Sequence, residues 1–244
     1  MIEWLLSLLN TSPSEFVLCL EFIFLFLFLS LFSYFFKEVG VYLFIAITMI
    51  VANLQVLKIV EFSFYPEPIA LGKMAICFTF LGSDILAECF GKKSAFKGVY
   101  IGFTANIFLI FLMLITIGYP PANVSSLNLH QNLKTVFTPT LSIFIAGGVT
   151  FIISQILDIT IFLKIKEKFT KQTVWIRSFI STSISSLIDN ILFYTFALYI
   201  FNSFVDFDTL VYSYILGTLI FRLIIIFFSS FIIVFIKKII NCRP

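Results

Sequence analysis

Long apolar segments, separated by short polar connections, run through most of this chain. One of them reads "EFIFLFLFLSLFSYFF" and is apolar on every face, not at alternate positions. About 20 apolar residues in a helix span the roughly 30 Å hydrocarbon core of a bilayer. Because lipid offers no partners to backbone N–H and C=O groups, such segments must be helical. The pattern therefore predicts an all-α, polytopic membrane helical bundle.

The segments number about seven, and six to seven crossings fit the pattern. We expect the spans at 16–36, 40–60, 69–90, 95–118, 140–164, 174–201 and 209–236. The third is the weakest, because only Met74 to Ser83 is free of charge before Asp84. The first 15 residues contain no Lys or Arg, so they lack the basic region of an export signal. Residues 1–244 are thus expected to form a single membrane domain whose first span is retained.

Basic residues follow alternate segments, and this asymmetry predicts the orientation. One side of the bundle receives Lys37, Lys92, Lys93, Lys97, Lys164, Lys166, Lys168, Lys171, Lys237, Lys238 and Arg243. The other side receives Lys58, Lys73 and Lys134, together with Asp206 and Asp208. Loops rich in Lys and Arg stay in the cytoplasm. The N-terminus is therefore expected outside and the C-terminus in the cytoplasm of a cell whose inner membrane holds the protein.

Composition supports a membrane protein and excludes several functions. The chain has 244 residues, of which 60% are hydrophobic and only 12% charged, whereas soluble domains contain about 25% charged residues. The net charge of +3 is spread between apolar segments, so no nucleic-acid surface is expected. His130 is the single histidine, and the four cysteines show no metal-type spacing. We expect no metal, no cofactor and no enzymatic activity.

The polar connection "GYPPANVSSLNLHQNLKTVFTP" follows the fourth segment. Pro120, Pro121 and Pro139 fall within it, and proline interrupts helices. We expect this stretch to be the longest loop of the chain. On the predicted topology it lies outside the cell, with His130 solvated in it.

Several charged side chains fall inside the predicted spans. Asp84 and Asp158 lie in the third and fifth segments, Asp189 in the sixth and Arg222 in the seventh. A charge at the centre of a spanning helix costs roughly 2.5–3.5 kcal/mol on insertion scales. Polar contacts between membrane helices return only about 0.6 kcal/mol each. Helix pairing alone is therefore a weak reason to keep three acids, and a functional polar pocket is the stronger interpretation.

A repeat strengthens this interpretation. "SQILDITIF" at 154–162 and "SSLIDNILF" at 185–193 share Ser-x-x-x-Asp-x-x-x-Phe. Residues four apart in a helix lie on one face, so each copy presents a hydroxyl, an acid and a ring together. Because the copies occupy consecutive antiparallel segments, they can form a polar pocket walled with rings. Chance similarity in a chain so rich in Phe and Ile is the alternative.

Two blocks of the sequence resemble the queuosine precursor transporters of the "putative vitamin uptake" family. The first is "YPEPIALGKMAICFTFLGSDILAECFGKKSAFKGVYIGFTANI", with an Asp-x-x-x-Glu-x-Tyr-Gly-like pattern in which Phe90 replaces the Tyr. The second is "SQILDITIFLKIKEKFTKQTVWIRSFISTSISSLIDNILFYTFALY", with Gln-x-x-Asp…Phe and Trp-x-Arg…Ser-Thr…Asp…Phe. Ser83 is a second departure, because an apolar residue or glycine is expected at that position of the family's pattern. The resemblance covers about residues 40–235.

The resemblance implies an inner-membrane importer of 7-deazaguanine bases, such as preQ0, preQ1 or queuine, that are used to modify tRNA. A guanine-like edge offers two parallel donors to one carboxylate, and its ring stacks on aromatic faces for roughly 1–3 kcal/mol per base. The candidate substrate-binding residues are Asp84, Glu88, Asp158, Asp189, Asn53, Gln155, Asn190, Arg177, Arg222, Phe162, Phe193, Tyr194 and Trp175.

The mechanism expected is that of a secondary carrier or facilitator, since the chain contains no Walker-type Gly-Lys-Ser/Thr motif. An alternative is the substrate-binding subunit of an energy-coupling-factor vitamin importer; an ATPase partner is not required here but is left open. An intramembrane aspartyl protease is less favoured, because its Gly-x-Gly-Asp and Tyr-Asp motifs are missing. Lipid and a small-molecule substrate are the expected partners, and a homo-oligomer is compatible with the pattern.

Overall fold

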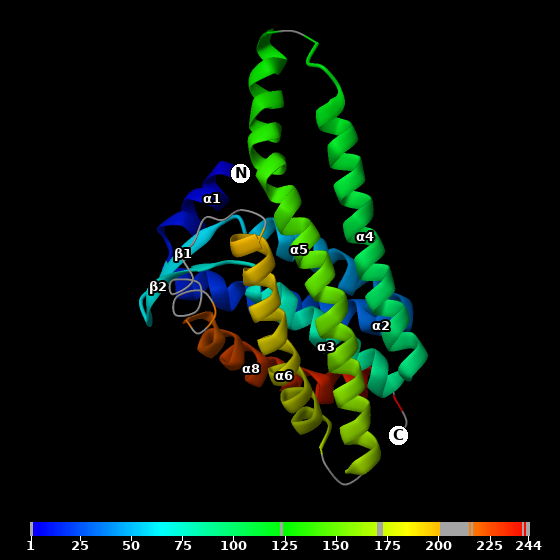
Figure 1. The fold of residues 1–244 in the computed structure, drawn as a ribbon. Helices are drawn as coiled ribbons and strands as arrows, with labels where there is room; N and C mark the ends of the chain where they lie inside the picture. Colours follow the sequence, from blue (N-terminus) through cyan, green and yellow to red (C-terminus); the bar gives the residue numbers. More distant parts are fainter. Residues whose placement is uncertain are drawn as a thin grey trace.

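The computed structural model describes residues 2–122, 124–169, 173–200, 215, 217–240 and 242. Helices dominate it, and one two-stranded hairpin interrupts them (Figure 1). The helices are α1 (Ile2–Thr11), α2 (Ser14–Gln55), α3 (Lys73–Cys89), α4 (Lys92–Gly118), α5 (Val124–Lys168), α6 (Val174–Tyr194), the π-helix η1 (Thr195–Ile200) and α8 (Gly217–Ile239). The strands are β1 (Ile59–Phe62) and β2 (Tyr65–Ala70).

Helix α2 is two antiparallel segments joined at Lys37. The backbone there has φ 49° and ψ −125°, a conformation that residues with a Cβ rarely adopt. Beyond the turn, a Cβ on Gly40 would lie 2.0 Å from the Phe32 carbonyl oxygen, so only glycine fits this close approach. Gln55 at one end of α2 donates a 2.8 Å hydrogen bond to Glu21 near the other. The first two predicted spans therefore form a helical hairpin.

The second and third predicted spans were drawn too long, because residues 59–70 form the β-hairpin. Val60 pairs with Ile69 and Phe62 with Tyr65 in antiparallel register. Prolines at 66 and 68 lack the N–H that a helix interior requires, which explains why β2 is extended. The hairpin is the departure from the predicted all-α class.

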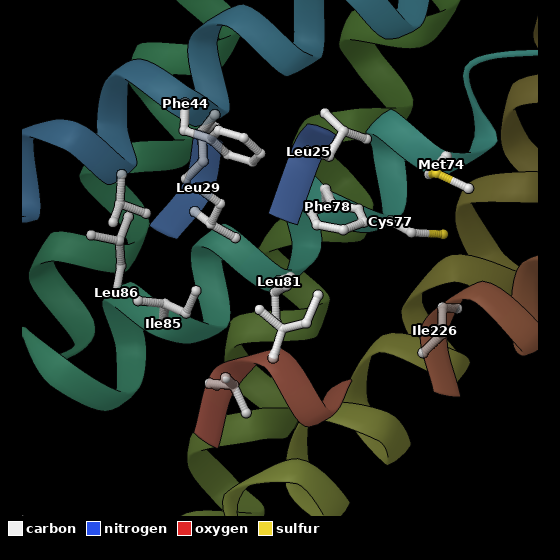
Figure 2. Packing of buried hydrophobic residues seen from close by; sticks show 14 of the residues in the cluster. Leu25, Leu29, Phe44, Met74, Cys77, Phe78, Leu81, Ile85, Leu86 and Ile226 are labelled. Carbon is white, nitrogen blue, oxygen red and sulfur yellow. The ribbon is translucent and has the colours of Figure 1, made fainter. Parts of the chain in front are cut away.

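Helix α3 occupies the centre of the bundle and contacts α2, α4, α5, α6 and α8. Fifteen of its 17 residues are buried. On one side Leu25 and Phe44 of α2 pack against Phe78 and Leu81 of α3, as Figure 2 shows. A helix enclosed by protein on all sides does not have to be uniformly apolar. This explains how the least apolar predicted span can still lie inside a membrane bundle.

The predicted long external loop is wrong. Helix α4 ends at Gly118, and α5 begins at Val124 and continues through Pro139 to Lys168. The polar residues of this stretch therefore lie on a helix that projects beyond the bundle with the end of α4 (Figure 1). Polarity correctly indicated exposure, and Pro139 interrupts one backbone hydrogen bond without ending the helix.

The two ends of the bundle differ in charge. At one end, Glu88 at the end of α3 contacts Lys166 of α5, Arg177 of α6 and Lys237 of α8. We call this the lysine-rich end. The opposite end carries the β-hairpin, where Ser63 donates hydrogen bonds to Glu15 at the start of α2. We call it the hairpin end.

The start of α2 and the end of α8 therefore lie at opposite ends, as an odd number of crossings requires. Four described helices are long and apolar enough to span a membrane: Ser14–Gln55, Lys92–Gly118, Ile143–Lys168 and Thr218–Ile239. The number of crossings and the side that faces the cytoplasm stay predictions. Lys171, Asp206, Asp208, Arg243 and the start of the seventh predicted span lie outside the described residues.

Candidate functional site

Buried polar side chains form a continuous layer where α3, α5, α6 and α8 meet. Its members are Thr79, Ser83, Asp84, Ser154, Gln155, Asp158, Ser178, Ser181, Thr182, Ser185, Asp189, Asn190 and Arg222. On α5 and α6 these residues recur at spacings of three and four, so they face inward while apolar neighbours face lipid. The layer contains six of the thirteen predicted site residues, including three of the four predicted acids.

Asp189 and Arg222 form the ion pair of this layer nearest the hairpin end. The Arg222 Nη2 atom lies 2.7 Å from Asp189 Oδ2, and both side chains are at least nine-tenths buried. Ser154 Oγ donates to the other carboxylate oxygen at 3.1 Å. Arg222 Nη1 donates to the Ser186 carbonyl at 2.9 Å. The pair is thereby fixed in orientation by α5, α6 and α8 together.

Asn190 supports the same pair from the next position of α6. Its Oδ1 accepts a 3.2 Å hydrogen bond from Arg222 Nη1. Its Nδ2 donates to the Ile215 carbonyl at 2.9 Å and to Thr218 at 3.1 Å. The Asn190 amide therefore holds Arg222 in place and connects α6 to α8.

A narrow cavity opens beside the ion pair at the hairpin end. Its volume is about 30 Å³, room for only about two water molecules and far below the roughly 300–1,000 Å³ of small-molecule pockets, so a base fits only after the surrounding helices move apart. Its lining residues are Ala52, Asn53, Val56, Leu71, Gly72, Lys73, Ile76, Gly147, Thr150, Asp189, Phe193 and Arg222. The cavity thus combines a carboxylate, two cations, an amide, a hydroxyl and an aromatic ring. We call it the Asp189 cavity.

Lys73 lines this cavity from the first position of α3. Only 6% of the residue is exposed, and its Nζ lies 4.2 Å from the ring centroid of Tyr194 and 5.6 Å from that of Phe193. Such cation–ring contacts are worth more when the cation is desolvated. From the sequence, Lys73 was expected among the external basic residues and not among the site residues.

Asn53 reaches the cavity from the second half of α2. Its Nδ2 donates to Asn106 Oδ1 on α4 at 3.0 Å, and Asn106 in turn donates to the Phe144 carbonyl on α5 at 3.2 Å. Gly147 allows this approach, because a Cβ there would lie 2.3 Å from Asn53 Oδ1. The amide is therefore held between three helices.

Asp84 and Asp158 lie together deeper in the bundle, away from the Asp189 cavity. Both are fully buried. Asp84 Oδ2 accepts hydrogen bonds from Ser178 at 2.5 Å and Thr182 at 3.3 Å. The second oxygen of Asp84 and both oxygens of Asp158 accept no hydrogen bond from the described residues. The structure thus separates these two predicted acids from Asp189.

The predicted repeat does bring α5 and α6 face to face. Ser154 of the first copy donates to Asp189 of the second. Ser185 of the second copy lies beside the Asp158 carboxyl of the first. In this antiparallel arrangement the serine of each copy therefore lies beside the aspartate of the other copy, within the polar layer. The ring of the second copy, Phe193, lines the cavity.

Glu88 lies at the lysine-rich end and not at the cavity. Its carboxylate is 2.6 Å from Lys237 Nζ, 2.9 Å from Lys166 Nζ and 3.2 Å from Arg177 Nη2. The Glu88 backbone carbonyl accepts a further hydrogen bond from Lys166 at 3.2 Å. Four helices are joined at this carboxylate. Glu88 and Arg177 therefore close one end of the bundle in this structure.

Three further predicted residues contact other side chains of the bundle and not the cavity. Gln155 is bound to α3, accepting from Ser83 at 2.6 Å and donating to Thr79 at 3.2 Å. Phe162 is fully buried under the Arg177 guanidinium, 5.7 Å from the ring centroid. Trp175 stacks on Phe231 with centroids 4.8 Å apart. A direct substrate contact of these three residues stays a prediction.

Sequence reasoning missed Lys73, Thr150 and Gly147 as cavity residues. The signal for Lys73 was its place at the first turn of the weakest span, directly after Gly72. Thr150 lies four residues before Ser154, on the face that the repeat already defined. Gly147 gave no local signal, because the need for a glycine comes from Asn53 on another helix.

Comparison with known proteins gives two matches. Residues 70–236 match the model of a family described as "Putative vitamin uptake transporter". The chain is also similar to a protein of Bacillus subtilis (strain 168) named "Probable queuosine precursor transporter". The two are 31% identical over 160 residues, which cover 65% of this chain and 68% of the relative. No solved structure matches the chain at a significant level.

Proposed function

Because this chain belongs to the "Putative vitamin uptake transporter" family, we propose that it imports queuosine precursors, which are 7-deazaguanine bases, and binds them in the Asp189 cavity. Membership of that family and its apolar helices make the chain a multi-pass membrane transporter. The name of the Bacillus subtilis relative supports the substrate class. The single observation that supports the site is a buried carboxylate–arginine pair that borders a cavity inside the bundle.

The chemistry of the cavity suits a guanine-like edge. A carboxylate offers about four acceptor positions, and Asp189 uses one oxygen for Arg222 and the other for Ser154. Acceptor capacity therefore remains for the ring N–H and exocyclic amine of the base. Asp189 is held rigid by these contacts, which lowers the cost of binding.

The other walls of the cavity complete the proposed site. Asn53 can accept a hydrogen bond from the base at its Oδ1, since its Nδ2 already donates to Asn106 and to the Met49 carbonyl. Phe193 offers a ring for stacking, and Lys73 a buried cation. A flat aromatic guest uses both a polar edge and an apolar face, as this set provides.

The position of the cavity suits one step of a transport cycle. It lies at the hairpin end, while the Glu88 ion pairs hold the lysine-rich end together. On the predicted orientation, the base enters from outside as this small cavity widens, while the cytoplasmic end is closed. Import then requires the Glu88 contacts to separate as helices rearrange around the site, as in other secondary transporters.

The test is an uptake assay in a bacterial strain that can neither synthesise nor import queuosine precursors. The full chain is expressed there without any added ATPase partner, and preQ0, preQ1 or queuine is fed one at a time. Queuosine in the tRNA is then measured. We expect it with at least one base, compared with none in cells that carry an empty vector. Its absence with all three bases, despite normal amounts of the protein in the membrane, would contradict the proposed function.

A further inference from the structure

The carboxyl groups of Asp84 and Asp158 face each other in the middle of the bundle. They are close enough to interact electrostatically, and two ionised carboxylates could only repel each other, because neither can donate a hydrogen bond. A hydrogen bond between the two carboxyl groups would therefore need a proton on one of them. This contact joins α3 to α5 and lies against α6, whose Ser178 and Thr182 donate to Asp84.

No cation neutralises this pair among the described residues. The nearest arginines on the packed helices are already engaged, Arg177 with Glu88 and Arg222 with Asp189. Lys166 and Lys237 also bind Glu88. On its other sides α3 meets α2 and α4 through apolar contacts such as Ile45 against Gly82.

Three carboxyl oxygens of the pair have no hydrogen-bond donor in the described part of the chain. They are one oxygen of Asp84 and both oxygens of Asp158, and both side chains are fully buried. Burying a charged carboxylate without a partner is very unfavourable, and two adjacent carboxylates do not both ionise. The neighbouring hydroxyls are engaged elsewhere, Thr182 with Asp84, Ser181 with the Ser178 carbonyl and Ser185 with the Ser181 carbonyl.

We infer that Asp84 and Asp158 form a proton-binding site in which the two carboxyl groups share one proton. The site is separate from the Asp189 cavity and from the Glu88 ion pairs. Lys73, Asp84 and Glu88 lie in this order along α3, and the rise of 1.5 Å per residue puts Asp84 about 16 Å from Lys73 and about 6 Å from Glu88. The proton thus lies between the cavity and the closed end.

This position gives the proton a role in transport, a step that rests on the proposed function. With the proton present, α3, α5 and α6 pack without repulsion. Loss of the proton leaves two negative charges in contact and favours separation of α3 from α5. Arg177 and Ser178 are neighbours on α6, and Arg177 holds Glu88 while Ser178 holds Asp84. Movement of α6 therefore changes the proton site and the closed end together.

The direct test measures the proton without any substrate. Infrared difference spectra of the purified full chain in lipid report protonated carboxyl groups, and deuterium exchange identifies their band. We expect a band at neutral pH in the wild type that shifts in frequency in Asp84→Asn and in Asp158→Asn and is lost in the double variant. Glu61→Gln, which changes an exposed carboxylate on β1, is the matched control and should retain the band. Absence of the band in the wild type, or an unchanged band in the double variant, would overturn the inference.

A second measurement connects the site to transport. Proteoliposomes containing a trapped pH indicator receive the base that supports queuosine formation in cells, and internal acidification is followed. We expect acidification that depends on the base in the wild type and at least a tenfold loss in Asp158→Asn. Uptake of the base without acidification, or uptake driven by sodium instead, would overturn proton coupling while leaving the proposed function intact. An infrared band without uptake of any base would contradict the function and leave the proton site standing.

Discussion

Asp189 and Glu88 are two carboxylates bound to buried arginines, yet their surroundings differ. Asp189 pairs with Arg222 and borders a cavity of about 30 Å³ at the hairpin end. Glu88 contacts Arg177, Lys166 and Lys237 at the lysine-rich end, and it lines no described cavity. One acid is fixed but leaves space beside it, whereas the other is surrounded by cations from three helices. The first arrangement suits a guest, and the second holds helix ends together.

The largest effect is expected at Asp189. Asp189→Ala leaves Arg222 buried without its partner, a change that typically costs 3–5 kcal/mol. Asp189→Asn keeps the size of the side chain and removes only the charge. Hydrogen bonds to charged groups contribute about 1.5–3 kcal/mol, so we expect uptake in Asp189→Asn to fall by about 10- to 100-fold. Queuosine accumulation in tRNA, normalised to protein in the membrane, measures the loss.

The matched control for this variant is Glu167→Gln, an exposed acid near the end of α5 that should transport normally. Wild-type uptake by Asp189→Asn would remove the distinction between the two acids, because it would show that the cavity carboxylate is as dispensable as a surface one.

A smaller effect is expected when the cavity itself is narrowed. In Gly147→Ala the new Cβ would lie 2.3 Å from Asn53 Oδ1, so the amide must move. We expect the KM for uptake to rise about tenfold with the protein still folded. Gly118→Ala is the control, since no atom lies within 4 Å of its Cβ position. An unchanged KM in Gly147→Ala would place substrate binding away from Asn53 and the Asp189 cavity.

The sequence predicted that the acids face inward, because the free-energy cost of a charge in hydrocarbon excludes them from contact with lipid. It also predicted the meeting of α5 and α6, since the repeat places Ser154 and Asp189 on facing stripes. These conclusions need only helix periodicity and the price of a charge in hydrocarbon. The same reasoning did not divide the acids into separate sites, because periodicity gives the face of a helix and not its depth against a neighbour.

Other features depend on contacts between distant residues. The partners of Glu88 lie 78, 89 and 149 residues further along the chain, so no local pattern reveals them. Lys73 was interpreted as an external charge, since lysines near span ends usually reach the interface. Its burial follows from Phe193 and Tyr194 on α6. The β-hairpin was missed because hydropathy alone extended the second span over residues 56–60 and the third over residues 69–72.

The smallest effect on uptake is expected at Glu88. Access of a water-soluble reagent to the lysine-rich end tests whether this residue keeps that end closed. Glu88→Gln weakens contacts to Lys166 and Lys237, which are partly exposed and contribute only about 0–1 kcal/mol each, and its amide oxygen can still accept from buried Arg177. We therefore expect uptake to change less than about threefold. The expected signature is faster reaction of Cys242, whose sulfur lies 3.8 Å from the Glu88 carbonyl, with a water-soluble thiol reagent.

Asp189→Asn is the matched variant for this measurement, and it should leave the rate of Cys242 labelling unchanged. The two acids would then give opposite results, with uptake sensitive at Asp189 and access sensitive at Glu88. If Glu88→Gln instead abolishes uptake and leaves labelling unchanged, Glu88 contacts the substrate directly. The lysine-rich end would then be a second binding region, and the closed end would have to be assigned to other contacts.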